Sequence, residues 1–232
     1  MFDEVLALCM EADINIQNIN YQLLQENYSL LLEGEDSSAN EKKILTKLKD
    51  TITEFFTKIL DAMKRTATKI LTLSNRLNSM GMASVLDKKM EDVLVPQHNL
   101  NAIMTWAENV IDGIDKSYGT FDRYESFEEC RKRNGLTEMT PSTYGQEKSI
   151  LDMYKTAIDF VKKQRNTILN KFKWDYSKTY GNSENGQKVI KAIFKVQKES
   201  ISEIQKRVNY SIKFITTAIR RSYNVSGYRK LT

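Results

Sequence analysis

Proline and glycine are scarce in this 232-residue chain, which contains only 2 prolines and 9 glycines. β-Sandwiches, barrels and Rossmann-type folds need many more residues of these two types for their turns. The composition therefore excludes those folds and favours helices. With an apolar fraction of 41% and a charged fraction of 28%, the chain is typical of globular proteins. It is also long enough to bury a core without disulfides or metals.

Histidine and cysteine are scarcer still, with 1 histidine and 2 cysteines. These numbers exclude a disulfide framework, and they exclude zinc sites built from four cysteines, from two cysteines with two histidines, or from two histidines. We interpret His98, which follows Pro96 closely, as an ordinary turn residue. The expectation is a protein with no metal and no cofactor.

Long apolar runs are also missing, since none approaches the ~18 residues of a membrane-spanning helix. The first residues are acidic, at Asp3 and Glu4, where a secretion signal would be basic. We expect neither a signal peptide nor a transmembrane helix.

Charge is strongly segregated along the chain. Residues 1–41 hold nine acidic and no basic residues, whereas residues 42–89 hold eleven basic and four acidic ones. Residues 188–232 hold eleven basic residues against two acidic ones. Such blocks are typical of interacting segments. Either the acidic segment lies along a basic helix of the same monomer, or it is a separable piece that masks or addresses a basic body.

Apolar periodicity predicts an all-α fold, an elongated helical bundle with two long helices of about 35 residues and no sheet. The long helices are expected over 44–77 and 187–223, the second with a heptad-like seam that packs lengthwise against a partner helix. Ser211 occupies one seam position. The other seam residues are apolar or small: Ile201, Ile204, Val208, Ile215, Ala218 and Ser222.

The shorter elements divide the chain into four regions. These are an acidic helical segment (1–33), a helical region (41–118), an irregular connection (119–146) and a helical region with a basic tail (147–232). Within them we expect a helix over 85–95 that is stopped by Pro96, a helix capped by Asn99, a charged helix near 125–133, a helix over 147–172 and a loop over 177–186.

No glycine-rich phosphate loop, GxSxG elbow, HExxH or calcium-loop pattern occurs in the sequence. Neighbouring acids such as Glu128 and Glu129 are typical of a solvated helix face. We therefore predict that the protein is not an enzyme.

Two basic helical segments are candidate interaction surfaces. The amphipathic stretch 42–65 fits a membrane-surface helix, and it fits a helix with its apolar face in a core equally well. The C-terminal helix and tail favour phosphate contacts that do not read base sequence. The candidate phosphate contacts are Lys206, Arg207, Lys213, Arg220, Arg221, Arg229 and Lys230.

The tetrapeptide Leu31-Leu32-Glu33-Gly34 stands where the acidic segment gives way to a polar linker. It resembles the Leu/Ile-x-Glu sites, followed by Gly or Ala, that head-maturation proteases of large tailed bacteriophages cut. In that family, internal head proteins carry an N-terminal capsid-targeting segment that the protease removes. The resemblance implies a processing site formed by Leu31, Glu33 and Gly34.

Together these features predict a non-enzymatic structural or assembly protein, a bacteriophage virion component located in the virion or the host cytoplasm. The expected partners are other virion subunits or further copies of the chain in an oligomer, and nucleic acid through its phosphates. The alternative is a membrane-surface-binding or toxin-like helical protein that acts through the helix over 42–65.

Overall fold

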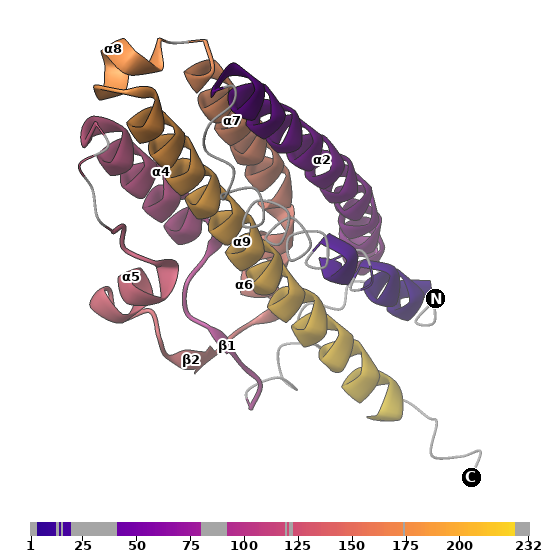
Figure 1. Ribbon diagram of the computed structural model, residues 1–232. Coiled ribbons are helices and arrows are strands. Elements are labelled where there is room, and N and C mark those ends of the chain that lie inside the picture. Colours follow the sequence, from indigo (N-terminus) through magenta and orange to yellow (C-terminus); the bar gives the residue numbers. More distant parts are fainter. Residues whose placement is uncertain are drawn as a thin grey trace.

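The computed structural model describes residues 4–12, 14, 16–19, 41–79, 92–118, 120, 123–173 and 175–225. Residues 4–12 and 16–19 are helical. The later elements are α2 (Glu41–Ser79), β1 (Leu94–Pro96), α4 (Leu100–Lys116), α5 (Phe127–Arg133), β2 (Met139–Pro141), α6 (Tyr144–Asp152), α7 (Tyr154–Lys171), α8 (Tyr176–Tyr180) and α9 (Ser183–Val225). The predicted all-α bundle is confirmed (Figure 1).

Two long helices dominate the structure, as the apolar periodicity predicts. α2 has 39 residues and α9 has 43, which correspond to lengths of about 58 and 64 Å. Both bury an apolar stripe that repeats in steps of three and four residues. In α9 this stripe is the predicted seam, and Ile204 and Val208 are fully buried in it together with Ser211.

α9 runs through the centre of the bundle and packs against α4, α6, α7 and α8, while α2 packs against α7 and α6 (Figure 1). One cluster of buried apolar side chains connects these helices. Phe55 of α2 makes edge-to-face contact with Phe194 of α9 at a centroid distance of 5.0 Å. α9 is therefore held on several sides, and most of its described side chains are buried or half-buried.

The N-terminal residues belong to the same core. Val5, Cys9 and Ile16 are at most 1% exposed. On the outside of this segment, Glu4 pairs with Arg76 and Glu11 pairs with Lys69. The described part of the acidic segment thus lies along basic α2 within the monomer, as the first of the two interpretations expects.

A short antiparallel ribbon of β1 and β2 corrects the expectation of no sheet, with Val95 opposite Thr140 in the register. The expected helix over 85–95 is wrong at Leu94 and Val95, which belong to β1; residues 80–91 lie outside the described ranges. Each strand ends in proline, at Pro96 and Pro141. Proline restricts the residue before it to extended backbone, so both segments favour a strand.

Helix ends follow local capping chemistry. Asn99 caps α4 as predicted, and its side chain accepts a 3.0 Å bond from the Ala102 amide. The helix expected over 147–172 instead begins at Tyr144, because Thr143 and Gln146 form a capping box, and it is interrupted at Met153.

The loop expected over 177–186 is also corrected. Most of it is helical, because α8 occupies its first residues and α9 already begins at Ser183. At this start, the Asn182 side chain accepts a 2.7 Å bond from the Asn185 amide.

Candidate nucleic-acid interface

Several cations of the basic helix α2 are paired with neighbouring acids. Its ion pairs are Lys58–Glu54, Lys64–Asp61, Lys69–Glu11 and Arg76–Glu4. Lys49 and Arg65, which form no ion pair with another described residue, point about 160° apart around the helix. The two described cations that remain unpaired on α2 thus do not share a face.

The apolar face of α2 points inward. Ile52, Phe55 and Ile59 are at most 1% exposed and pack in the core. A membrane-surface helix needs this face free to enter the lipid boundary. The arrangement matches the core-facing interpretation of residues 42–65, and no described helix is long and apolar enough to cross a bilayer.

α9 differs from α2 because several of its exposed cations form no ion pair with a described acid, although Glu199 lies one turn from Lys195 and interacts with it electrostatically. Lys191, Lys195, Lys213 and Arg220 are exposed, and none of them forms an ion pair with another described residue. We call these four residues the α9 cation stripe. The ammonium group of Lys195 also lies over the Tyr124 ring, 5.7 Å from its centroid.

The structure separates the seven candidate phosphate contacts. Lys213 and Arg220 are exposed and belong to the stripe. Lys206 is exposed but pairs with Glu203 at 2.5 Å, and Arg221 pairs with Asp92. Arg229 and Lys230 lie outside the described residues, as does the candidate processing site Leu31, Glu33 and Gly34.

The prediction of Arg207 as a phosphate contact is wrong. Its side chain points into the protein and is unable to reach a phosphate. Its side chain is 5% exposed and lies against the fully buried Glu147. The reason is its position around the helix axis. Position 207 lies about 160° from the exposed Lys191, on the opposite side of α9. A list of cations along the chain takes no account of this rotation.

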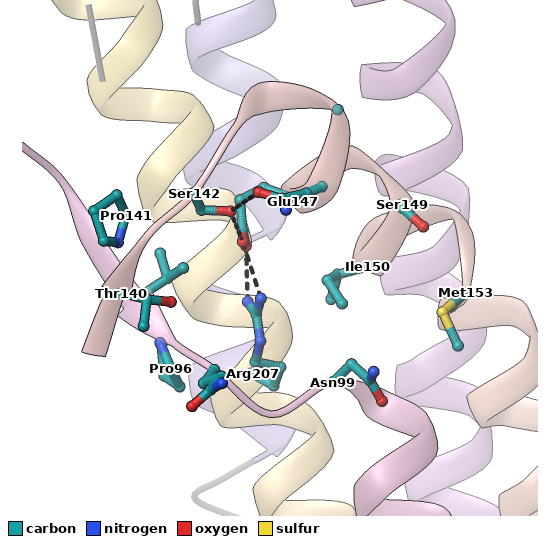
Figure 2. Close-up of a pocket in the computed structure, with 14 residues that line it drawn as sticks. Pro96, Asn99, Thr140, Pro141, Ser142, Glu147, Ser149, Ile150, Met153 and Arg207 are labelled. Carbon is teal, nitrogen blue, oxygen red and sulfur yellow. Dashed lines mark hydrogen bonds and ion pairs between the residues drawn. The ribbon is translucent and has the colours of Figure 1, made fainter. Parts of the chain in front are cut away.

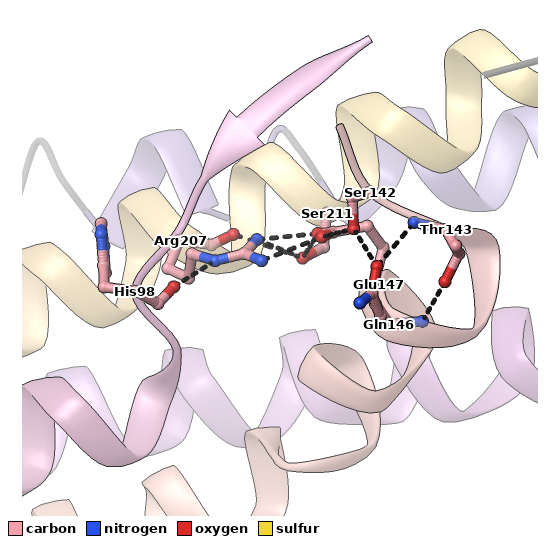
Figure 3. Close-up of polar contacts among 7 residues, drawn as sticks. All are labelled: His98, Ser142, Thr143, Gln146, Glu147, Arg207 and Ser211. Carbon is pink, nitrogen blue, oxygen red and sulfur yellow. Dashed lines mark hydrogen bonds and ion pairs between the residues drawn. The ribbon is translucent and has the colours of Figure 1, made fainter. Parts of the chain in front are cut away.

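Glu147 and Arg207 form the centre of a buried polar network (Figure 3). Arg207 Nη1 and Nη2 donate to the two carboxylate oxygens of Glu147 at 2.7 and 2.9 Å. Ser211 and Ser142 donate to the same carboxylate at 2.6 and 2.7 Å. Arg207 Nε donates to the His98 carbonyl at 2.8 Å. The network connects α6 and the segment after β1 to α9. It therefore fixes how α9 is rotated about its own axis relative to these segments.

Burial raises the pKa of Glu147, but the Arg207 guanidinium and the two serine hydroxyls outweigh burial and hold the pKa below its usual value. Glu147 therefore stays ionised and is a weak base. Its contact with Ser142 does not activate that hydroxyl as a nucleophile, because a useful general base has a pKa near the working pH.

His98 is buried beside this network. Its ring meets Phe127 edge-on at a centroid distance of 5.3 Å. Burial, reinforced by the charges of Arg131 and Arg207, lowers the pKa of His98 to about 4. The ring is therefore neutral near pH 7. His98 follows Pro96 as predicted, and its side chain is buried.

A cavity of about 490 Å³ lies between the ribbon and the start of α6, with Pro96, Pro141, Ile150 and Met153 among its lining residues (Figure 2). Arg207 and Glu147 also line it, but their polar atoms are already engaged with each other. Among the described residues, no group of three or more His, Cys, Asp or Glu side chains is placed to hold a metal ion.

Sequence reasoning did not find Glu147, Ser142 or the pairing of Arg207. One signal was present, because Ser211 is a polar residue within an apolar seam and lies one turn from Arg207.

Comparisons with protein-family models, curated proteins and solved structures yield no match for this chain.

Proposed function

We propose that this protein is a non-enzymatic helical structural protein that binds nucleic acid through phosphates without reading base sequence. The α9 cation stripe is the observation that carries the proposal. Four exposed cations on one helix, none of them in an ion pair with another described residue, form the electrostatic footprint expected of phosphate binding.

The proposed setting is a bacteriophage virion, in which the chain assembles with other virion subunits or with further copies of itself. The resemblance of Leu31-Leu32-Glu33-Gly34 to head-maturation sites supports this setting. The buried positions of Val5 and Ile16 mean that a cut after Glu33 would leave the N-terminal segment docked on the body.

Salt dependence tests the proposal. Four phosphate contacts give a slope of about −3.6 in a plot of log affinity against log salt, so affinity for a random-sequence duplex falls on the order of 100-fold between 50 and 200 mM salt. The variant Lys191→Gln/Lys195→Gln/Lys213→Gln/Arg220→Gln should lose most of this binding.

A matched variant controls for net charge. Lys49→Gln/Lys58→Gln/Lys64→Gln/Arg65→Gln on α2 removes the same four charges from exposed positions and should bind almost as the parent does. Equal losses in the two variants would show that only the overall charge matters. Absence of binding at 50 mM salt would overturn the proposed function.

A further inference from the structure

The four cations of the α9 cation stripe share one narrow face of the helix. At 3.6 residues per turn, Lys191, Lys195, Lys213 and Arg220 fall within a sector of about 40° around the axis. The acids Glu199 and Glu203 lie outside this sector, about 80° and 120° from Lys191. Glu184 lies inside it, about 20° from Lys191, but pairs with Lys188 at 2.6 Å. The stripe is therefore a straight row that runs parallel to the helix axis.

The row consists of two pairs separated by a gap. A rise of 1.5 Å per residue places Lys213 about 33 Å from Lys191, and Arg220 about 38 Å from Lys195. The exposed cation between the pairs, Lys206, is held by Glu203 at 2.5 Å. The stripe thus offers two separate points of contact to an extended polyanion.

These distances bracket the helical repeat of duplex DNA, which is about 34–36 Å. A strand of the duplex returns to the same side of the molecule after each repeat. We propose that α9 lies along the axis of duplex DNA and contacts its phosphates at two points one helical turn apart, through Lys191 with Lys195 and through Lys213 with Arg220. This inference rests on the proposed function and adds the form of the nucleic acid and its orientation.

Buried polar contacts made by the part of α9 between the two pairs of cations keep both pairs on the same side of the helix. Gln197 donates a 3.0 Å bond to the Gln164 carbonyl, and the Tyr154 hydroxyl donates a 2.9 Å bond to Gln205. Arg207 is bound to Glu147 a little further along. The two pairs of cations are therefore presented at a constant spacing and orientation, which suits a rigid duplex.

Binding to duplexes of 6 to 20 base pairs tests this geometry. A duplex of 8 base pairs reaches only one pair of cations, so affinity should rise tenfold or more, beyond simple proportion to length, once the duplex reaches about 12 base pairs. Lys191→Gln/Lys195→Gln and Lys213→Gln/Arg220→Gln should each abolish this step. For an 8-base-pair duplex, each double variant should lower the affinity by no more than about twofold, because the other pair of cations can still bind it.

A second measurement uses 12-base-pair duplexes with uncharged methylphosphonate linkages. Neutral linkages in the central four steps should leave affinity nearly unchanged, whereas neutral linkages at both ends should remove the gain over 8 base pairs. The α2 variant Lys58→Gln/Lys64→Gln should retain the step.

Other outcomes have distinct meanings. Affinity that grows only in proportion to length, or equal binding of a 20-nucleotide single strand and a 20-base-pair duplex, would overturn the two-point geometry while leaving the proposed function intact. Binding to neither form, with or without capture of an acidic polypeptide such as polyglutamate, would overturn both.

Discussion

Arg207 and Glu147 are 60 positions apart in the chain, yet Arg207 Nη1 donates a 2.7 Å hydrogen bond to Glu147 Oε2 inside the core. Both side chains are at most 5% exposed. A buried ion pair costs desolvation energy, so its clearest effect is seen when one member is removed. The pair joins α9 to the start of α6 and thereby helps determine which face of α9 meets solvent.

Removing one member of this pair should strongly destabilise the protein. We expect Arg207→Met to lower the free energy of unfolding by about 3–5 kcal/mol, because Glu147 is left buried without its partner. Chemical denaturation followed by circular dichroism measures this change. The double variant Glu147→Met/Arg207→Met should recover much of the loss.

The exposed pair of Arg221 and Asp92 is the control for this experiment. Arg221→Met should change the stability little, because solvent screens an exposed pair. A single Arg207 variant as stable as the parent would show that the buried pair does not hold α9 in place.

His98 should make the fold sensitive to mild acid. Its pKa is lowered to about 4 in the folded protein from about 6.5 in the unfolded chain. Between these values the unfolded chain binds a proton that the folded protein does not bind, so stability is lost as the pH falls from 6.5 to 4. The loss should approach about 3 kcal/mol.

Denaturation midpoints measured across this pH range test the prediction, with His98→Gln as the comparison. The variant keeps the backbone carbonyl that accepts from Arg207 and lacks the titrating ring, so its stability should change less between pH 6.5 and 4. Parallel curves for the two proteins would assign the pH dependence to other groups.

Deletion of residues 1–33 should prevent independent folding of the remainder. Val5, Cys9, Ala12, Ile16 and Ile19 are at most 1% exposed, and each large aliphatic side chain contributes about 1.5–3 kcal/mol when buried. Together these contributions approach the 5–15 kcal/mol that is typical of a whole domain. We expect residues 34–232 to aggregate on expression. A soluble product with a cooperative thermal melt would instead support a separable address segment.

Tyr118 is a position where a substitution should stabilise the protein. It follows α4 with φ of 50° and a side chain that is 61% exposed. This left-handed conformation costs a non-glycine residue about 1 kcal/mol. Tyr118→Gly should therefore raise the free energy of unfolding by several tenths of a kcal/mol or more, whereas Tyr118→Val should lower it. A thermal melt of each variant provides the measurement, and a lower midpoint for the glycine variant would contradict the strain argument.

The sequence by itself determined the helices and their buried faces. Each long helix has an apolar repeat of three and four residues that must be buried, and this repeat alone indicates which side of α9 carries Ile204 and Val208. Asn99 likewise ends in its expected place, because capping involves only the first turn of a helix. Where the expectation failed locally, as at Val95 before Pro96, the information was present in the neighbouring residue.

Only the tertiary structure decided which charges remain available at the surface. Lys213 and Arg207 look equivalent in a list of basic residues, but one is exposed and the other is bound to an acid 60 positions away. The same holds for α2, whose cations are neutralised in part by Glu4 and Glu11 of a distant segment. The physical reason is that helical periodicity is a local property, whereas the partner of a charged side chain depends on how separate helices pack together.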